Sequence, residues 1–245
     1  MSIKAISFDF WNTLFREQPG AFGRHQDRRR SLLAEAVGVY REVSPSELDE
    51  ACQVERASQE RIWQEQHRTP AAADRVNSIL SHLDVLLPDA KSAELVASFE
   101  EIILDHPPVL VEGAREVLGD LSRRYRLGII SDVGFTPGRV LKLLLGHHGL
   151  IGFFDSLVFS DEAGRAKPHT EVFERTARVL GAKPETIVHV GDLERTDIVG
   201  AKQAGYRAIR FTGVTPMHKD ETTLADFVTT ELKEVPRLVG LLGSP

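Results

Sequence analysis

Short apolar runs alternate with helical patterns over most of this chain. The runs are rich in β-branched and aromatic residues, and several are apolar at consecutive positions, which is typical of strands buried on both faces of a parallel sheet. They predict strands at 3–8, 126–131, 156–160, 186–190 and 207–211, with a weaker one at 227–229. Helices are expected between them, at about 113–124, 136–147, 169–181 and 195–204. This repetition predicts an α/β protein with a doubly wound parallel sheet.

The stretch between the first two strands has a wholly helical pattern. It contains no convincing strand, and four helices are expected near 19–40, 45–67, 70–86 and 88–105. Ser44-Pro45-Ser46-Glu47 is a good start signal for the second of them, with Ser44 as the cap and Glu47 completing a capping box. Pro107-Pro108 marks the return to the sheet. The sequence predicts a core domain of residues 1–15 and 108–245, with a four-helix domain of residues 16–107 inserted into it.

Length, charge and composition restrict the classes of protein that fit. A chain of 245 residues can bury one substantial core and a smaller accessory domain. The net charge of −6 argues against a general nucleic-acid binder. Cys52 is the only cysteine, so no disulfide can form within the chain. No stretch approaches the roughly 18 apolar residues of a membrane span, and Asp9 interrupts the N-terminal apolar run. We expect a soluble, cytoplasmic monomer or homodimer that binds neither nucleic acid nor membranes.

Chemically active side chains follow four of the predicted strands at their C-terminal ends, where such sheets bind ligands. They are Asp9 with Thr13, Ser131 with Asp132, Lys167, and Asp192 with Asp197. Asp9 is the most informative, because a charge between Phe8 and Phe10 is costly to bury without a purpose. The others also fit ordinary structural roles, since hydroxyls end turns, lysines lie in solvent and aspartates cap helices. Their common position in the strand pattern is what predicts a site.

The order of these groups resembles the four motifs of the haloacid dehalogenase superfamily. The run from Asp9 to Thr13 is similar to the Asp-x-Asp-x-Thr nucleophile motif of its phosphatases, and the other three groups follow in the same order over the whole sheet domain. The helical insertion matches the four-helix cap of the superfamily's first cap class in position and size. The resemblance implies a hydrolase with a Rossmann-like, doubly wound parallel sheet core and an inserted four-helix cap domain.

The residue types suit phosphoryl transfer. An ionised aspartate such as Asp9 can attack phosphorus and form a covalent ester, which splits one displacement into two easier ones. Lys167 can neutralise charge on the transferring oxygens, and the Ser131 hydroxyl can orient them. Carboxylates at positions 192 and 197 would repel that of Asp9 without a cation, which indicates a hard, oxygen-preferring ion, Mg²⁺.

The resemblance assigns a role to each position. It implies that Asp9 and Asp192 ligate Mg²⁺ together with the backbone carbonyl of Trp11, with Asp197 farther from the ion. The residues expected to act in catalysis are Asp9, Thr13, Ser131 and Lys167. The residues expected to bind the phosphorylated substrate are Ser131, Asp132, Lys167 and Arg28.

Position 11 departs from the phosphatase pattern. Trp11 occupies the place of the second aspartate, which protonates the leaving group and then activates the attacking water. An indole N–H cannot transfer protons in this way, and general acid–base catalysis contributes roughly 10² to 10⁴ in rate. Glu194, His25 or an acid of the substrate could compensate, and the sequence does not choose among them. An aromatic residue here also resembles the dehalogenase branch, which uses no metal, although Asp192 suits a metal site.

Arg24 and Arg28 share one face of the first predicted cap helix, at i,i+4 spacing. This face suits either an anion-recognition patch or an ordinary solvated surface. The favoured function is Mg²⁺-dependent hydrolysis of a small phosphorylated metabolite through a phosphoaspartate at Asp9. Two alternatives stay open: C–halogen hydrolysis of a 2-haloacid by Asp9, and a degenerate member that binds a phosphorylated ligand with little turnover.

Overall fold

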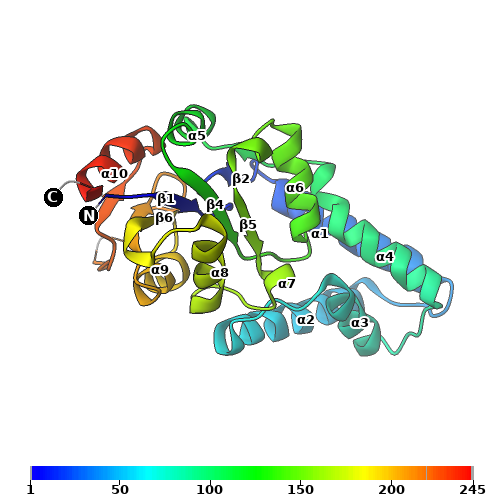
Figure 1. Cartoon of the computed structure of the whole chain (residues 1–245). Helices are drawn as coiled ribbons and strands as arrows, with labels where there is room; N and C mark the ends of the chain where they lie inside the picture. Colours follow the sequence, from blue (N-terminus) through cyan, green and yellow to red (C-terminus); the bar gives the residue numbers. More distant parts are fainter. Residues whose placement is uncertain (1, 219, 244–245) are drawn as a thin grey trace.

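A six-stranded sheet forms the centre of the computed structural model, which describes residues 2–218 and 220–243 (Figure 1). Its order is β5-β4-β1-β6-β7-β8, and every neighbouring pair is parallel. The strands are β1 (Ala5–Phe8), β4 (Arg126–Ser131), β5 (Ser156–Phe159), β6 (Ile187–Gly191), β7 (Arg207–Phe211) and β8 (Phe227–Thr229). Because Phe8 of β1 pairs with Ile129 of β4 and Val190 of β6, the ends of these three strands lie side by side.

Helices cover both faces of this sheet (Figure 1). The helices on one face are α5 (Ala114–Leu121), α6 (Gly138–His147) and α10 (Val235–Gly243), which share an apolar core with Phe8. The helices on the other face are α8 (Thr170–Leu180) and α9 (Val199–Gln203), which share a second core with Ala5. A single-turn helix, α7 (Ser160–Ala163), follows β5. The prediction of a doubly wound α/β fold is confirmed.

The helical insertion has a hydrophobic core of its own. It consists of α1 (Ala21–Gly38), α2 (Pro45–Gln66), α3 (Ala72–His82) and α4 (Asp89–Glu101), followed by a 3-10 turn, Ile102–Leu104. Leu33, Ile79 and Phe99 are among the side chains buried between these helices. The capping box forms as expected, since Ser44 Oγ accepts from the Glu47 N–H at 3.3 Å and Glu47 accepts from the Ser44 N–H at 2.8 Å.

A short antiparallel ribbon connects the insertion to the core. Its strands are β2 (Phe15–Arg16) and β3 (Val109–Leu110), where the chain leaves and re-enters the sheet domain. Two-residue strands carry no periodicity, so the sequence did not predict them. The domain boundaries at 15/16 and 107/108 stay a prediction.

The helix expected at 195–204 is divided. Residues Glu194–Ile198 form a π-helical turn, and α9 begins at Val199. Single π-turns of this kind are frequent at functional sites. Here the wider turn brings the Asp197 carboxylate back to the Leu193 N–H, at 3.0 Å. Among the described residues, no helix is both long and apolar enough to cross a membrane.

Candidate active site

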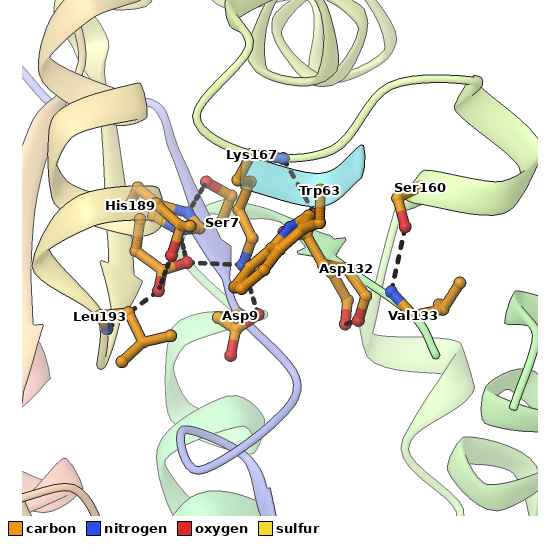
Figure 2. Close-up of polar contacts among 12 residues, drawn as sticks. Ser7, Asp9, Trp63, Asp132, Val133, Ser160, Lys167, His189 and Leu193 are labelled. Carbon is orange, nitrogen blue, oxygen red and sulfur yellow. Dashed lines mark hydrogen bonds and ion pairs between the residues drawn. The ribbon is translucent and has the colours of Figure 1, made fainter. Parts of the chain in front are cut away.

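Asp9 lies at the end of the central strand and is almost fully buried. Its N–H donates to the Val190 carbonyl at 2.8 Å, which continues the β1–β6 pairing by one residue. Its carboxylate accepts from Lys167 Nζ at 2.5 Å (Figure 2). Burial raises the pKa of Asp9 well above its usual range, against the opposing effect of Lys167. A second cation nearby would favour the ionised carboxylate.

The loop after Asp9 turns sharply because Asn12 adopts a positive φ of 55°. Asparagine tolerates this left-handed conformation better than most residues. The Asn12 N–H donates to the Phe15 carbonyl at 2.6 Å, and the Phe15 N–H donates to the Phe10 carbonyl at 2.9 Å. The turn therefore holds Asp9, Trp11 and Thr13 within one compact loop.

Lys167 reaches the site from the segment after α7. Its Nζ donates to Asp9 and to Asp197, at 2.5 Å each, and its own N–H donates to the Asp132 carboxylate at 2.9 Å. The side chain is only 3% exposed, so it is not a solvated loop lysine. Burial by itself would lower its pKa, but Asp197 and Asp9 outweigh that effect and raise it. Lys167 is a fixed cation between two carboxylates.

Asp197 has partners besides Lys167. His189 Nε2 lies 3.2 Å from its Oδ1, and Ser7 Oγ lies 2.9 Å from the other ring nitrogen (Figure 2). Burial favours a higher pKa for Asp197, but Lys167 and His189 together lower it. A Cβ at Gly191 would lie 2.4 Å from Asp197 Cγ, so only glycine fits beside this carboxylate. The sequence analysis predicted His189 as a core residue. The side chain is fully buried, and it also contacts Asp197 of the site.

Asp192 completes the group of carboxylates at the end of β6. Its Oδ2 accepts from Thr215 Oγ1 at 2.6 Å, and its carbonyl accepts from Arg210 Nε at 3.2 Å. Burial, followed by repulsion from Asp197, raises the pKa of Asp192 to about 6. The ionised form of this carboxylate is thus destabilised in spite of the opposing effects of Thr215 and Lys167.

The site contains more negative than positive charge. Carboxylate oxygens of Asp9, Asp192 and Asp197 lie within 4.8 Å of one another, and all three side chains are buried. Lys167 is the cation that pairs with two of them, so further positive charge would stabilise the group. Buried carboxylate oxygens are the donors that Mg²⁺ prefers. The residues present therefore fit a divalent hard cation.

The two predicted hydroxyl groups are both buried: Thr13 follows Asp9 by four residues, and Ser131 ends β4, the strand paired with β1. Ser131 Oγ donates to the Asp132 carbonyl at 3.1 Å. Thr13 Oγ1 makes no hydrogen bond among the described residues. An unsatisfied buried hydroxyl is costly, so Thr13 offers an unused polar atom in the nucleophile loop.

Trp11 does not supply a proton donor to the cluster through its ring. The ring packs edge to face on Phe10, with centroids 5.0 Å apart, and lines a cavity of about 490 Å³ between the core and the helical insertion. The Glu194 carboxylate binds other partners. It accepts from Thr223 Oγ1 at 2.5 Å and forms an ion pair with Arg210 at 3.4 Å. His25 lines the same cavity as Trp11 and is buried.

Arg28 is not brought to this cavity. Its side chain is exposed on α1, whereas the neighbouring Arg29 lines the cavity wall. A helix places successive residues about 100° apart, so identifying the inward face required the packing of α1 against the core. For that reason the sequence analysis selected Arg28, and not Arg29, as the substrate-binding arginine.

Asp132 and Trp63 connect the cap helix α2 to the sheet domain. Trp63 Nε1 donates to Asp132 Oδ2 at 3.0 Å, and the Arg195 guanidinium lies 3.8 Å from the indole centroid (Figure 2). The sequence favoured Trp63 as part of the cap core. The only feature of the sequence that indicated a contact outside the cap was the position of this tryptophan near the end of a polar helix. Asp132 accepts from both Trp63 and Lys167, so both of its oxygens have protein partners.

Curated relatives match about half of the chain. A glyceraldehyde 3-phosphate phosphatase from Methanothermobacter thermautotrophicus is 38% identical over 123 residues, which are 49% of this chain and 53% of that protein. A pyrophosphatase PpaX from Bacillus cereus is 34% identical over 124 residues, 49% of this chain and 55% of that protein. The chain thus spans about half the length of the curated relatives it matches.

Solved structures match the fold over almost the whole chain. A 2-haloacid dehalogenase from Pseudomonas syringae pv. Tomato aligns with a TM-score of 0.74 at 24% identity, covering 98% of this chain and 99% of that one. A HAD phosphatase from Thermococcus onnurineus aligns with a TM-score of 0.71 at 23% identity, covering 97% and 98%. The model of one family, haloacid dehalogenase-like hydrolase, matches residues 3–205. On the basis of this match and of the site geometry, the chain belongs to the haloacid dehalogenase-like hydrolases.

Proposed function

We propose that this protein is a Mg²⁺-dependent phosphatase that hydrolyses a small phosphate monoester through a covalent phosphoaspartate at Asp9. The observation that carries the proposal is the cluster of buried carboxylates of Asp9, Asp192 and Asp197, paired with the single ammonium of Lys167 at the strand ends. The phosphatase names of the curated relatives support the same reaction class.

The cation would be held by the carboxylates of Asp9 and Asp192 and the backbone carbonyl of Trp11, with Asp197 behind them. When bound, Mg²⁺ would offset the excess negative charge and orient an oxygen of the phosphoryl group. The Trp11 carbonyl can serve whatever side chain the residue carries. Metal binding is therefore compatible with tryptophan at this position.

In the first half of the reaction, an Asp9 oxygen attacks phosphorus and the bond to the leaving oxygen breaks. Lys167 is placed to neutralise a phosphoryl oxygen, while the buried hydroxyls of Ser131 and Thr13 can donate to the others. In the second half, water attacks phosphorus and the bond to Asp9 breaks. Inorganic phosphate leaves, and the carboxylate of Asp9 is regenerated.

The side chain of Trp11 provides no proton for the departing alkoxide and no base for the water. Glu194 does not replace it, because its carboxylate is bound by Thr223, Arg210 and the Leu224 N–H. We therefore expect fast turnover only for substrates whose leaving group needs little protonation. Hydrolysis of the phosphoaspartate should be slow as well.

The test uses p-nitrophenyl phosphate, whose leaving group barely needs a proton, with Mg²⁺ and with EDTA. The proposal expects Mg²⁺-dependent release of phosphate that is abolished in Asp9→Asn. The same preparations are given a 2-haloacid and assayed for halide. Halide release without metal would identify the dehalogenase alternative, and binding of phosphate esters without turnover in either assay would identify a degenerate member.

A further inference from the structure

The cavity of about 490 Å³ between the helical insertion and the core is not explained by the chemistry at Asp9 alone. Trp11 and Asn12 of the nucleophile loop form part of its wall, and so does Phe135, which follows Asp132 in the chain. The cavity therefore adjoins the loop that follows Asp9 and the loop that follows Ser131. The organic part of a substrate bound at Asp9 would extend into it.

Three of the charged side chains in this cavity, those of Arg30, Glu55 and Arg75, are in arginine–carboxylate ion pairs, and Arg56 is exposed on α2. Four arginines and two glutamates line it. Arg75 donates to both oxygens of Glu55, at 2.5 and 3.1 Å, and both residues are buried. Arg30 pairs with Asp27 at 2.8 Å and with Asp49 at 2.7 Å. These two arginines are neutralised by carboxylates of the protein.

Arg29 lacks such a partner. Its Nε is buried without a hydrogen bond, and no carboxylate of residues 2–218 or 220–243 lies within 4.0 Å of its guanidinium. The guanidinium lies 4.8 Å from the centroid of the Phe135 ring, and Arg75 lies 3.6 Å from the same centroid. Burial and then Arg75 lower the pKa of Arg29 to about 10, which leaves it cationic at neutral pH.

Glu17 is the remaining carboxylate on the cavity wall, and it offsets the charge of Arg29 only in part, because the two groups do not form an ion pair. It lies beyond ion-pair distance from the arginine, while its Oε1 is 3.9 Å from His25 Nδ1. Its side chain is 38% exposed, so water screens its charge. Arg29 is partly buried, and its buried Nε is an unsatisfied donor in the wall of a cavity large enough for a small ligand.

We infer that Arg29 binds an acidic group of the substrate in this cavity. An anion there would accept the hydrogen bond that Nε lacks and offset the positive charge of Arg29. Phe22, Phe99 and Ile103 provide apolar wall for the stem that joins the two ends of such a molecule. The substrate class is a phosphate monoester whose organic part ends in a carboxylate or a second phosphate. This inference rests on the proposed phosphatase function.

The first test compares kcat/KM for three series of equal chain length: alkyl phosphates, alkyl phosphates with a terminal carboxylate, and alkane bisphosphates. The wild-type protein should prefer one of the two acidic series by about tenfold or more, the scale of one charge-assisted hydrogen bond, and the favoured series identifies the acidic group. Arg29→Met should abolish the preference, and Arg29→Lys should retain part of it. Arg61→Met is the matched control, because Arg61 is exposed on α2 and does not line the cavity.

The second test does not depend on turnover. Calorimetry measures binding of alkylphosphonates with and without a terminal carboxylate or second phosphonate to Asp9→Asn, alone and combined with Arg29→Met or Arg29→Lys. Tighter binding of an acidic probe that is lost with Arg29→Met supports the inference even if no ester is hydrolysed, in which case the phosphatase proposal alone fails. Equal binding of neutral and acidic probes, or a preference unchanged by both Arg29 substitutions, would overturn it.

Discussion

At the scale of single residues, Asp9 and Trp11 belong to the same tight loop but face different parts of the molecule. The carboxylate of Asp9 joins the buried cluster with Lys167, whereas the indole of Trp11 packs on Phe10 and lines the cavity under the cap. The proposed nucleophile and the position at which the phosphatases carry their acid/base group thus face different parts of the molecule, although they are two residues apart.

Replacing Trp11 by aspartate should restore the missing proton transfer. We expect Trp11→Asp to raise kcat on alkyl phosphates by roughly 10- to 100-fold, toward the low end of what general acid–base catalysis contributes. The rate on p-nitrophenyl phosphate should change much less, because its leaving group needs no proton. Trp11→Phe serves as the control for loss of the indole. An unchanged ratio of the two rates in folded Trp11→Asp would contradict this account.

Gly191 is a residue whose importance depends on one close approach. Because a Cβ there would lie 2.4 Å from Asp197 Cγ, Gly191→Ala should displace the Asp197 carboxylate. A displacement on the ångström scale lowers kcat/KM by about 10²-fold in comparable cases, and we expect a loss of that order. Gly146→Ala on α6 is the matched control, since a Cβ there meets no atom within 4 Å. Equal activity of the two variants would argue against a role for Asp197.

Residues at strand ends could be identified from the sequence, whereas residues on helix faces could not. Asp9, Lys167 and Asp192 follow apolar runs, so their place at one edge of the sheet follows from the fold class. Arg28 and Arg29 differ by one helical position, and packing that the sequence does not specify turns Arg29 toward the cavity. The same limit applies to Trp63, whose contact with Asp132 is between residues far apart in the chain.

At the scale of elements, the C-terminal end of α2 and the segment after it are attached to the core by several polar contacts. Trp63 binds Asp132, the His67 carbonyl accepts from the Ala166 N–H at 2.7 Å, and Thr69 Oγ1 lies 2.7 Å from Ser160 Oγ. These contacts hold the cap against the loop that carries Lys167. The position of the cap and the order of the active site should therefore be linked.

Trp63→Phe should loosen this attachment while keeping an aromatic ring for Arg195. Loss of the indole hydrogen bond leaves one half-buried Asp132 carboxylate oxygen without that donor, which should lower the free energy of unfolding by about 1–3 kcal/mol. Amide hydrogen exchange should increase in the last turns of α2 and around Lys167. Urea unfolding and hydrogen exchange measure the two effects. Faster exchange spread evenly over all cap helices would point to general destabilisation instead.

Long periodic elements were predictable, and short ones were not. The strand at 126–131 was predicted with the bounds that β4 has, because a run of consecutive apolar residues marks a strand buried on both faces. The ribbon of β2 and β3 has two residues per strand, and α10 is a short helix at 235–243 that contains one proline and two glycines, residues of low helix propensity. Their formation depends on tertiary packing rather than on a local pattern.

At the scale of the whole molecule, the charge of the site should govern stability in a metal-dependent way. The carboxylates of Asp9, Asp192 and Asp197 are buried around one ammonium group, so repulsion among them opposes folding when no cation is bound. Asp9 follows β1, whereas Asp192 and Asp197 both follow β6, so the pairing of these two strands brings the charges together.

Mg²⁺ should therefore raise the melting temperature of the wild-type protein. At a concentration 100 times its dissociation constant, a ligand adds about 2.7 kcal/mol, which corresponds to roughly 5–11 °C for a chain of this size. Asp192→Asn should lose this gain and, in EDTA, melt no lower than the wild type, because it removes one repelling charge. Differential scanning calorimetry checks both expectations. A wild-type melting temperature unaffected by Mg²⁺ would remove the support for a metal site.

The measurement that tests the central claim most directly is detection of a phosphoryl group on Asp9. The protein is mixed with p-nitrophenyl phosphate and Mg²⁺, quenched rapidly in acid and digested, and its peptides are analysed by mass spectrometry. Because Trp11 provides no base for the attacking water, the phosphoaspartate should accumulate on the peptide that contains Asp9, and it should be absent in EDTA and in Asp9→Asn. Metal-dependent phosphate release without any label on Asp9, or a label on another residue, would contradict the account.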